Sequence, residues 1–389
     1  MKLKCAKSDL NNAVQTVQKA ISNKNTVPIL TGIYLSAKDG KLSLEATDYE
    51  IGISSTIDAE IEVEGNIVLA GKYFQELVKK LPGDIVEIAQ NREDRTIKIS
   101  SLMSEFNLLS MSAEEFPVLN RNNKQIKEGQ NFIKVKDNIL RELVKKTVFA
   151  CATDDSNPIY TGALLENTLE DIRMVATNTH RLAIKKIRRD DPITNVDIDN
   201  YIAGNETHKL CRLIIPAKVL NELARLMVYE LPVDVEIYWE KNKVSFIFEN
   251  VYFESRLIEG KYPEYFKVVP EKFNTVANIN VSLFYDAVER VSLMAKEGDY
   301  NVIKFAFQKD CVNITSNNPG IGKAYESVPV NLEGDELEIS FNAKYIIDIL
   351  KNITSDNIIF SLTTPLSAAS ICPDDEEEYI YIITPVRNM

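Results

Sequence analysis

The sequence predicts an α+β fold built from three homologous domains, each with two helices on antiparallel sheets. Two observations predict this fold, and the first is an internal repeat. The segment "PILTGIYL" at Pro28, which continues to "ATDYEIGI", returns at Pro158 as "PIYTGALL", which continues to "ATNTHRLAI". A weaker third copy, "VIKFAFQKDCVNITSNN", starts at Val302. Repeats of this length indicate one structural unit that recurs along the chain.

The second observation is a helical element that occurs three times, as "KYFQELVKKL", "KVLNELARLM" and "KYIIDILKNI". The copies begin at Lys72, Lys218 and Lys344. Each has an acidic residue about one helical turn after this lysine and a second basic residue about two turns after it. We therefore expect three homologous domains, at residues 1–127, 128–267 and 268–389.

In order along the chain, a helix opens each domain, short strands follow, and a second helix leads into further strands. The first helix places Leu10, Ala13, Val14 and Val17 on one face. Segments such as "KLSLEA", "AEIEVEG" and "RTIKIS" alternate apolar and polar residues, which is typical of half-buried strands. Long runs of strands after each helix favour antiparallel sheets with the helices on one face. The six expected helices are residues 7–24, 72–80, 134–146, 216–227, 281–297 and 343–351.

The composition is that of an ordinary folded protein, with 45% hydrophobic and 26% charged residues in 389. No segment approaches the roughly 18 consecutive apolar residues of a membrane span, and no signal peptide is evident, so we expect a cytoplasmic protein without membrane contact. The five cysteines are far apart and form no CxxC pair. This spacing predicts neither a disulfide framework nor a zinc site, and we expect no metal and no cofactor.

The charge is distributed unevenly. A net charge of −12 should repel nucleic acid, yet every expected helix except residues 281–297 carries a net positive charge. Residues seven apart on a helix share a face, so Lys72 and Lys79 form a pair of cations, as do Lys218 and Arg225. One interpretation is a solvated face with ion pairs inside each helix. The other is contact with the backbone of duplex nucleic acid, independent of base sequence.

The acidic run "DDEEE" at residues 374–378 is expected to be a solvated loop. A scaffold that binds only proteins is a further possibility for the whole chain, and the basic helices are the feature that separates it from a nucleic-acid binder.

His180, one of only two histidines, lies beside Thr177, Thr179 and Arg181. Nucleophilic catalysis would need a nucleophile, a base and an orienting group that converge. The sequence has no nucleophile elbow, phosphate loop or pair of zinc-spaced histidines to accompany them. In the other copy of the repeat Glu50 replaces His180, so this domain has specialised, which fits a binding pocket as well as a catalytic site. We favour binding and expect no catalytic residue.

Four motifs carry a resemblance to a known family: "EEFPVL" at residues 114–119, "TNTHRLA" at 177–183, "LIEGKYPEY" at 257–265 and "YIITPVR" at 381–387. Together they resemble the bacterial sliding clamps, the β subunits of DNA polymerase III, over essentially the full chain. The resemblance implies the DNA-clamp fold and a homodimer closed head to tail into a ring around duplex DNA. Such a ring is a non-catalytic processivity factor. Its implied partners are a clamp loader, the replicative polymerase and repair proteins, in a bacterial cytoplasm at the nucleoid.

The resemblance and the basic helices together give three sets of candidate residues. The implied pocket for short partner peptides consists of Thr177, His180, Arg181, Leu182, Pro263, Leu366, Ile382, Pro385, Val386 and Arg387. Thr384 stands where the best-known members have a larger apolar residue, and Asn388 and Met389 follow Arg387. The expected DNA contacts are Lys24, Lys72, Lys79, Lys80, Arg141, Lys145, Lys146, Lys218 and Arg225. The implied dimer interface includes Phe106, Leu108, Leu293 and Met294.

Overall fold

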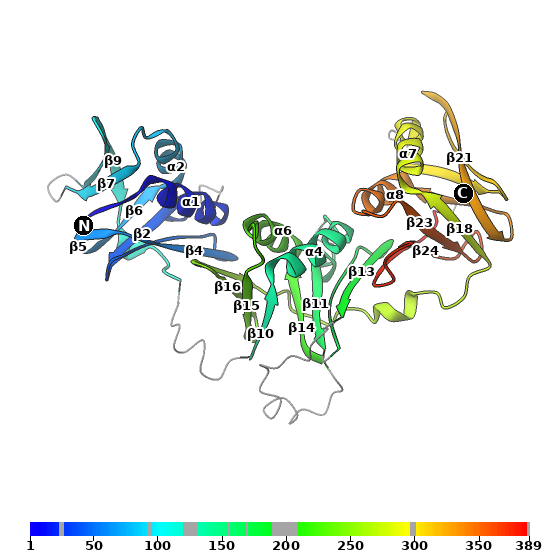
Figure 1. Ribbon diagram of the computed structural model, residues 1–389, viewed down its shortest axis with the longest axis horizontal. Helices are drawn as coiled ribbons and strands as arrows, with labels where there is room; N and C mark the ends of the chain where they lie inside the picture. Colours follow the sequence, from blue (N-terminus) through cyan, green and yellow to red (C-terminus); the bar gives the residue numbers. More distant parts are fainter. Residues whose placement is uncertain are drawn as a thin grey trace. The chain divides into compact units, whose positions relative to one another are not determined.

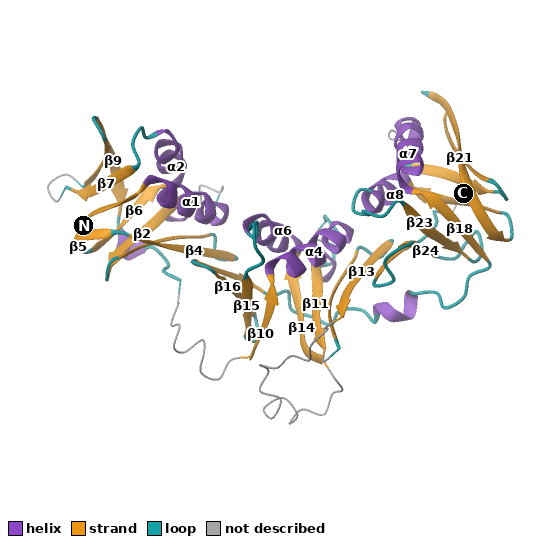
Figure 2. Ribbon diagram, in the orientation of Figure 1, coloured by secondary structure: helices purple, strands orange, loops and turns teal. Residues whose placement is uncertain are grey.

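The computed structural model combines helices with antiparallel sheets, which confirms the predicted α+β class (Figure 1, Figure 2). All strand pairings in the described part of the chain are antiparallel. No helix in that part is long and apolar enough to cross a membrane. The structure describes residues 1–22, 27–91, 95–119, 131–154, 156–168, 170–188, 209–295 and 301–386.

The six predicted helices are present, with two changes at their ends. The first becomes a 3₁₀ turn at Gln18–Ala20. The third begins later than predicted, because Lys134 and Lys136 belong to a strand and both pair with Asp234, at 2.9 and 2.7 Å. The helices are α1 (Lys7–Val17), α2 (Gly71–Lys80), α4 (Asp137–Thr147), α6 (Ala217–Leu226), α7 (Val281–Ala295) and α8 (Ala343–Leu350).

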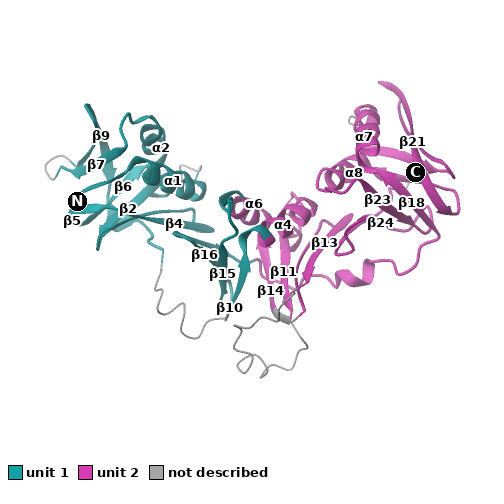
Figure 3. Cartoon of the chain, in the orientation of Figure 1, with its two compact units in different colours: residues 1–138, 225–257 teal, residues 139–224, 258–389 magenta. Residues whose placement is uncertain are grey.

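The chain forms two compact units, each containing one sheet (Figure 3). The first unit comprises residues 1–138 and 225–257, and the second comprises residues 139–224 and 258–389. The predicted middle domain, residues 128–267, therefore contributes strands to both units. The division into three domains stays a prediction.

The first unit has a sheet of 13 strands, and helices α1 and α2 pack against each other and against strands of this sheet (Figure 2). In spatial order the strands are β10 (Asn131–Lys136), β15 (Asp234–Trp239), β16 (Lys243–Phe248), β17 (Val251–Arg256), β4 (Ile51–Asp58), β3 (Lys41–Thr47), β2 (Gly32–Lys38), β6 (Gly65–Ala70), β9 (Ser104–Met111), β8 (Thr96–Ser101), β7 (Ile85–Gln90), β1 (Lys2–Ala6) and β5 (Glu60–Val63).

The second unit has a sheet of 12 strands. In spatial order they are β14 (Lys209–Pro216), β11 (Gly162–Thr168), β12 (Asp171–Thr177), β13 (Arg181–Arg188), β25 (Tyr379–Ile383), β24 (Ala369–Pro373), β23 (Asn357–Leu362), β18 (Thr275–Asn280), β21 (Gly322–Gly334), β20 (Cys311–Asn318), β19 (Val302–Phe307) and β22 (Leu337–Asn342).

Each sheet contains one pairing between strands about 200 residues apart in sequence, and these two pairings correspond to each other. We call the β4–β17 pairing the first seam and the β13–β25 pairing the second seam. Ile51 lies opposite Ser255 in the first seam, and Arg181 lies opposite Ile383 in the second. Such long-range pairing has no local sequence signal, so the seams could not be predicted.

Buried aromatic side chains form the core under α7 and α8. Phe284, Phe305, Phe307, Phe341 and Phe360 are all nearly inaccessible to solvent. The ring centroids of Phe307 and Phe360 are 5.2 Å apart, and those of Phe284 and Phe305 are 5.8 Å apart. Burying each ring stabilises the fold by about 1.5–3 kcal/mol, so this cluster is a large part of what holds α7 on the sheet.

Candidate functional site

The turn between β12 and β13 presents His180. The side-chain Oδ1 of Asn178 accepts hydrogen bonds from the backbone N–H of His180 and of Arg181, at 3.1 and 3.0 Å. The hydroxyl of Thr177 donates to the carbonyl oxygen of Arg181 at 2.6 Å. Thr179 has a φ of 76°, which is strained for a β-branched residue. These bonds hold the strained turn in one conformation.

The same turn occurs in the first copy of the repeat. Asp48 Oδ1 accepts from the N–H of Glu50 and of Ile51, at 3.0 and 2.8 Å, and the Thr47 hydroxyl donates to the Ile51 carbonyl at 2.8 Å. Tyr49 has a φ of 72°. The repeat found in the sequence is therefore also a repeat of hydrogen bonds and backbone angles.

A pocket of about 190 Å³ lies beside the His180 turn in the second unit. The turn is attached to Thr384, the residue directly after β25, because the His180 carbonyl accepts from both the N–H and the hydroxyl of Thr384, at 2.9 and 3.0 Å. The lining residues are Tyr160, Thr177, Thr179, His180, Arg181, Leu182, Pro263, Glu264, Tyr265, Val268, Ala368, Ile382 and Thr384.

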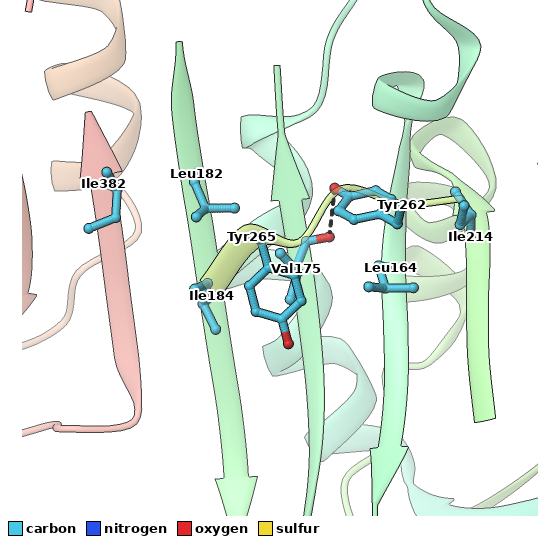
Figure 4. Close-up of a cluster of buried hydrophobic side chains, with 8 residues drawn as sticks. All are labelled: Leu164, Val175, Leu182, Ile184, Ile214, Tyr262, Tyr265 and Ile382. Carbon is cyan, nitrogen blue, oxygen red and sulfur yellow. Dashed lines mark hydrogen bonds between the residues drawn. The ribbon is translucent and has the colours of Figure 1, made fainter. Parts of the chain in front are cut away.

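The pocket rests on a cluster of buried side chains (Figure 4). Tyr262 donates its hydroxyl to the Val175 carbonyl at 3.2 Å, and Tyr265 donates to the buried carboxylate of Glu166. Burial, reinforced by the hydrogen bond to Glu166, raises the pKa of Tyr265 to about 12, so its hydroxyl stays a donor. The cluster consists of Leu164, Val175, Leu182, Ile184, Ile214, Tyr262, Tyr265 and Ile382.

The structure brings together most of the residues assigned to the pocket from the sequence. Leu366 is 67% exposed and does not line it; Ala368, two residues later, does. Pro385 and Val386 also lie outside the lining, and the Val386 N–H bonds to the Ser340 carbonyl at 2.8 Å. Arg387 lies outside the described residues. The residues placed at the pocket are Thr177, His180, Arg181, Leu182, Pro263 and Ile382.

Several lining residues were missed by the sequence analysis. Thr179, Glu264, Tyr265 and Thr384 lie inside the quoted motifs, so a wider reading of those motifs would have found them. Ala368 lies two residues after the assigned Leu366, and only the fold shows which of the two reaches the pocket.

The charged end of Arg181 bonds within the chain. Its side chain is 5% exposed, pairs with Asp348 Oδ2 at 2.6 Å and donates to the Phe149 carbonyl. Its guanidinium carbon lies 4.5 Å from the ring centroid of Tyr345 and 5.6 Å from that of Phe149. Arg181 therefore contributes shape to the pocket, while its charge is neutralised by Asp348.

Lys146, expected at the DNA, is also neutralised inside the chain. It is buried, pairs with Glu376 and lies 5.2 Å from the ring centroid of Tyr379. Lys185, also buried, pairs with the same Glu376. The acidic run is thus not a simple solvated loop, since Glu376 makes ion pairs with two buried lysines. The charges on a helix could not predict this burial, because the sequence does not show which face of the helix is covered.

The other expected DNA contacts are on the molecular surface. Lys72, Lys79 and Lys80 on α2, and Lys145 on α4, are exposed and form no ion pair with another described residue. Lys218 and Arg225 are exposed and Arg141 is half-buried. Lys24 lies outside the described residues.

The residues assigned to a dimer interface lie on two different elements. Phe106 on β9 is 41% exposed and Leu293 on α7 is 51% exposed. Leu108 and Met294 are half-buried.

Family models of the DNA polymerase III beta subunit match almost the whole chain. The N-terminal domain matches residues 1–120, the central domain residues 134–264 and the C-terminal domain residues 266–387. The chain belongs to the DNA polymerase III beta subunit family. The resemblance inferred from the four motifs is confirmed.

Relatives and solved structures agree with the family models. The beta sliding clamp of Bacillus subtilis is 35% identical over 397 residues, covering 100% of both chains, and that of Staphylococcus epidermidis is 33% identical over 385 residues, covering 97% of this chain and 96% of its own. The crystal structure of the DNA polymerase sliding clamp from Bacillus subtilis has a TM-score of 0.89 at 34% identity, with full coverage of both chains. A Pseudomonas aeruginosa clamp bound to griselimycin has a TM-score of 0.88 at 26% identity, again with full coverage.

Membership of this family makes the chain a DNA polymerase processivity factor, a sliding clamp that acts in DNA replication. Within the residues that the structure describes, no group of three or more His, Cys, Asp or Glu side chains is arranged to hold a metal ion.

Proposed function

We propose that this sliding clamp works as a closed homodimeric ring, loaded around duplex DNA by a clamp loader, in the bacterial cytoplasm at the nucleoid. The ring is held by topology and not by tight contact with DNA. It tethers the replicative polymerase and repair proteins by short peptides that dock in the pocket beside His180. It catalyses no reaction itself.

Two strands that change partner midway support the dimer. In β9, residues 104–109 pair with β8, and only Ser110 and Met111 pair with β6. In β21, residues 322–329 pair with β20, and residues 330–334 pair with β18. Within the described residues the first part of each strand therefore has one free edge. A free edge is a template for pairing with another chain, and a head-to-tail ring would cover one edge with the other.

The basic face of α2 supports contact with the DNA backbone. Lys72, Lys79 and Lys80 are exposed on this helix, in a chain whose net charge is −12. Lysine side chains attract phosphate from a distance without fixed geometry, which permits sliding. The acidic remainder is repelled by DNA, so attraction is confined to the basic surfaces.

The pocket is the observation that carries the partner-binding part of the proposal. Apolar walls from Leu182, Ile382 and Val268, with polar groups at His180 and Glu264, suit the capture of apolar peptide side chains. An enzymatic role for His180 is not supported, because the proton of the neighbouring Thr177 hydroxyl is donated to a backbone carbonyl and is not aimed at a base.

Peptide binding tests this assignment. Val268, an exposed lining residue, is changed to Glu, and binding of a fluorescently labelled clamp-binding peptide from a bacterial replicative polymerase is followed by anisotropy. We expect affinity to fall at least about tenfold, since a carboxylate would enter an apolar pocket. Val118→Glu, an exposed site on the corresponding linker of the first unit, is the matched control and should bind normally. Equal binding by both variants would place the peptide elsewhere.

A further inference from the structure

The two faces of the second seam carry different groups. Because strand residues alternate between faces, Leu182 and Ile382 point to one side and their neighbours Arg181 and Ile383 to the other. Leu182 and Ile382 belong to the apolar cluster under the pocket. Arg181 instead contacts α8, so the same strand connects the pocket to a helix behind it.

Helix α8 holds this strand through Asp348 and Tyr345. Asp348 pairs with the buried Arg181 guanidinium at 2.6 Å, and the Tyr345 ring stacks on it with 4.5 Å between guanidinium carbon and ring centroid. A buried arginine needs such partners, because leaving its charge unpaired in the interior is strongly destabilising. The position of Arg181 is therefore set by α8 together with Phe149, whose carbonyl also accepts from the guanidinium.

A second contact leads from α8 to the turn itself. The Tyr345 hydroxyl accepts a hydrogen bond from the Asn178 side-chain amide at 3.2 Å. The other end of the same amide group holds the N–H of His180 and of Arg181. The Tyr345 carbonyl in turn accepts from the Tyr381 hydroxyl at 3.0 Å, which ties the helix to β25. Both strands of the seam and the turn between β12 and β13 are thus attached to one turn of α8.

The first seam shows that the turn does not need these contacts in order to form. There, Ile51 replaces Arg181, yet Asp48 and Thr47 make the same turn with the same hydrogen bonds. Ile51 is buried and carries no charge to be paired. The copy of the turn that borders the pocket therefore has a link to a helix through Arg181, and the first copy, with Ile51 at this position, does not have this link.

We propose that Asp348 and Tyr345 are positioning residues for partner binding, acting through Arg181 and Asn178 to fix the His180 turn at the rim of the pocket. The proposal rests on the proposed role of the pocket as a peptide site. It also assigns Arg181 a supporting role, with no direct ionic contact to the peptide.

The test uses Asp348→Asn and Tyr345→Phe, each of which keeps the side-chain shape, in the full-length protein. Asp356→Asn, an exposed acid in the loop after α8, is the matched control for the loss of charge. Two quantities are measured: the affinity of the labelled polymerase peptide, and the NMR signals of the His180 ring in the free protein. With only two histidines in the chain, these ring signals are readily assigned.

We expect both variants to bind the peptide about tenfold more weakly, to release it faster, and to shift the His180 ring signals before peptide is added. Asp348→Glu should recover part of the affinity, and Asp356→Asn should match the wild type. Normal affinity in Asp348→Asn and Tyr345→Phe would overturn the proposal. Weaker binding with unmoved His180 signals would also overturn it, because the effect would then not pass through the turn. Failure of the wild type to bind would instead overturn the role of the pocket.

Discussion

Lys146, Lys185 and Glu376 form a largely buried ionic group in the second unit. Lys185 is 5% exposed, and both lysines pair with the one carboxylate of Glu376. Glu142 supplies a second carboxylate, 3.2 Å from the Lys185 ammonium and 3.6 Å from that of Lys146. Two buried cations need this negative charge, so Glu376 should matter for stability more than an ordinary loop acid.

Replacing Glu376 should destabilise the folded chain. We expect Glu376→Gln to lower the free energy of unfolding by about 2 kcal/mol, because two buried ammonium groups lose their shared partner. Urea unfolding measures this change. Glu377→Gln removes the same charge from the exposed neighbouring residue and should change stability little. Equal losses in the two variants would mean that net charge, and not the buried pair, is responsible.

The same group predicts a pH dependence. Burial acts to raise the pKa of Glu376, but hydrogen bonds from Lys146 and Lys185 outweigh it and hold this pKa below its ordinary value. A lowered folded-state pKa gives stability that is complete above the unfolded-state value of about 4.3 and is lost as the pH falls through the folded-state value. Wild type and Glu376→Gln should therefore converge in stability on acidification below about pH 4. A constant difference across that range would contradict this assignment.

At the scale of elements, the two seams share their turn but differ in what fills the space beside it. Leu182 in the second seam corresponds to Gly52 in the first. A Cβ atom placed on Gly52 would lie 2.5 Å from Leu119 Cδ2. The Leu119 N–H also bonds to the buried Glu45 carboxylate at 3.0 Å. In the first seam the chain's own linker thus occupies space next to the strand.

Gly52→Ala should therefore cost about 2 kcal/mol of unfolding free energy, through overpacking against Leu119. In a Leu119→Ala background the same substitution should cost less, since the nearest atom is gone and only Glu254 Cγ, at 2.9 Å, stays close to the added Cβ. Chemical denaturation of the four proteins in this double-mutant cycle measures the coupling. Additive effects would show that Leu119 is not what excludes a side chain at position 52.

Local elements were predictable from the sequence, and long-range contacts were not. The repeat identified the two corresponding segments at Thr47 and Thr177 without predicting their turns, and apolar spacing together with the recurring helical element located the six helices. The start of α4 was wrong because Lys134 and Lys136 look helical until their pairing with Asp234 is known. Lys145 and Lys146 are adjacent and chemically alike, yet one is exposed and the other buried, which only the packing of α4 decides. The pocket motifs were recognisable, while Ala368 and Asp348 reach the site through the fold alone.

At the scale of the whole molecule, the proposed ring joins two chains through β9 and α7. Phe106→Glu and Leu293→Glu should each shift the protein from dimer to monomer at micromolar concentration, because each places a charge in an apolar interface. Light scattering after size-exclusion chromatography measures the mass. Leu231→Glu, at another exposed leucine, is the control and should stay dimeric. A wild-type monomer would contradict the dimer itself.

We expect contact with DNA to depend on the surface cations of α2. Lys79→Glu combined with Lys80→Glu should weaken association with duplex DNA about tenfold at low salt, and the difference from wild type should shrink as salt is raised. Lys241→Glu, an exposed lysine in the hairpin between β15 and β16, is the control. Lys146→Glu should instead lower the unfolding temperature, because its charge lies in the interior. Unchanged DNA association in the α2 variant would mean that the lysines of this helix face solvent and do not contact DNA.

Retention on circular DNA tests whether the ring encloses the duplex. The purified protein is loaded with a bacterial clamp loader and ATP onto nicked circular DNA, and half of the sample is then linearised. We expect long retention on the circles and rapid loss from the linear molecules, because a ring held by topology slides off a free end. Equal retention on circular and linear DNA would contradict enclosure of the duplex.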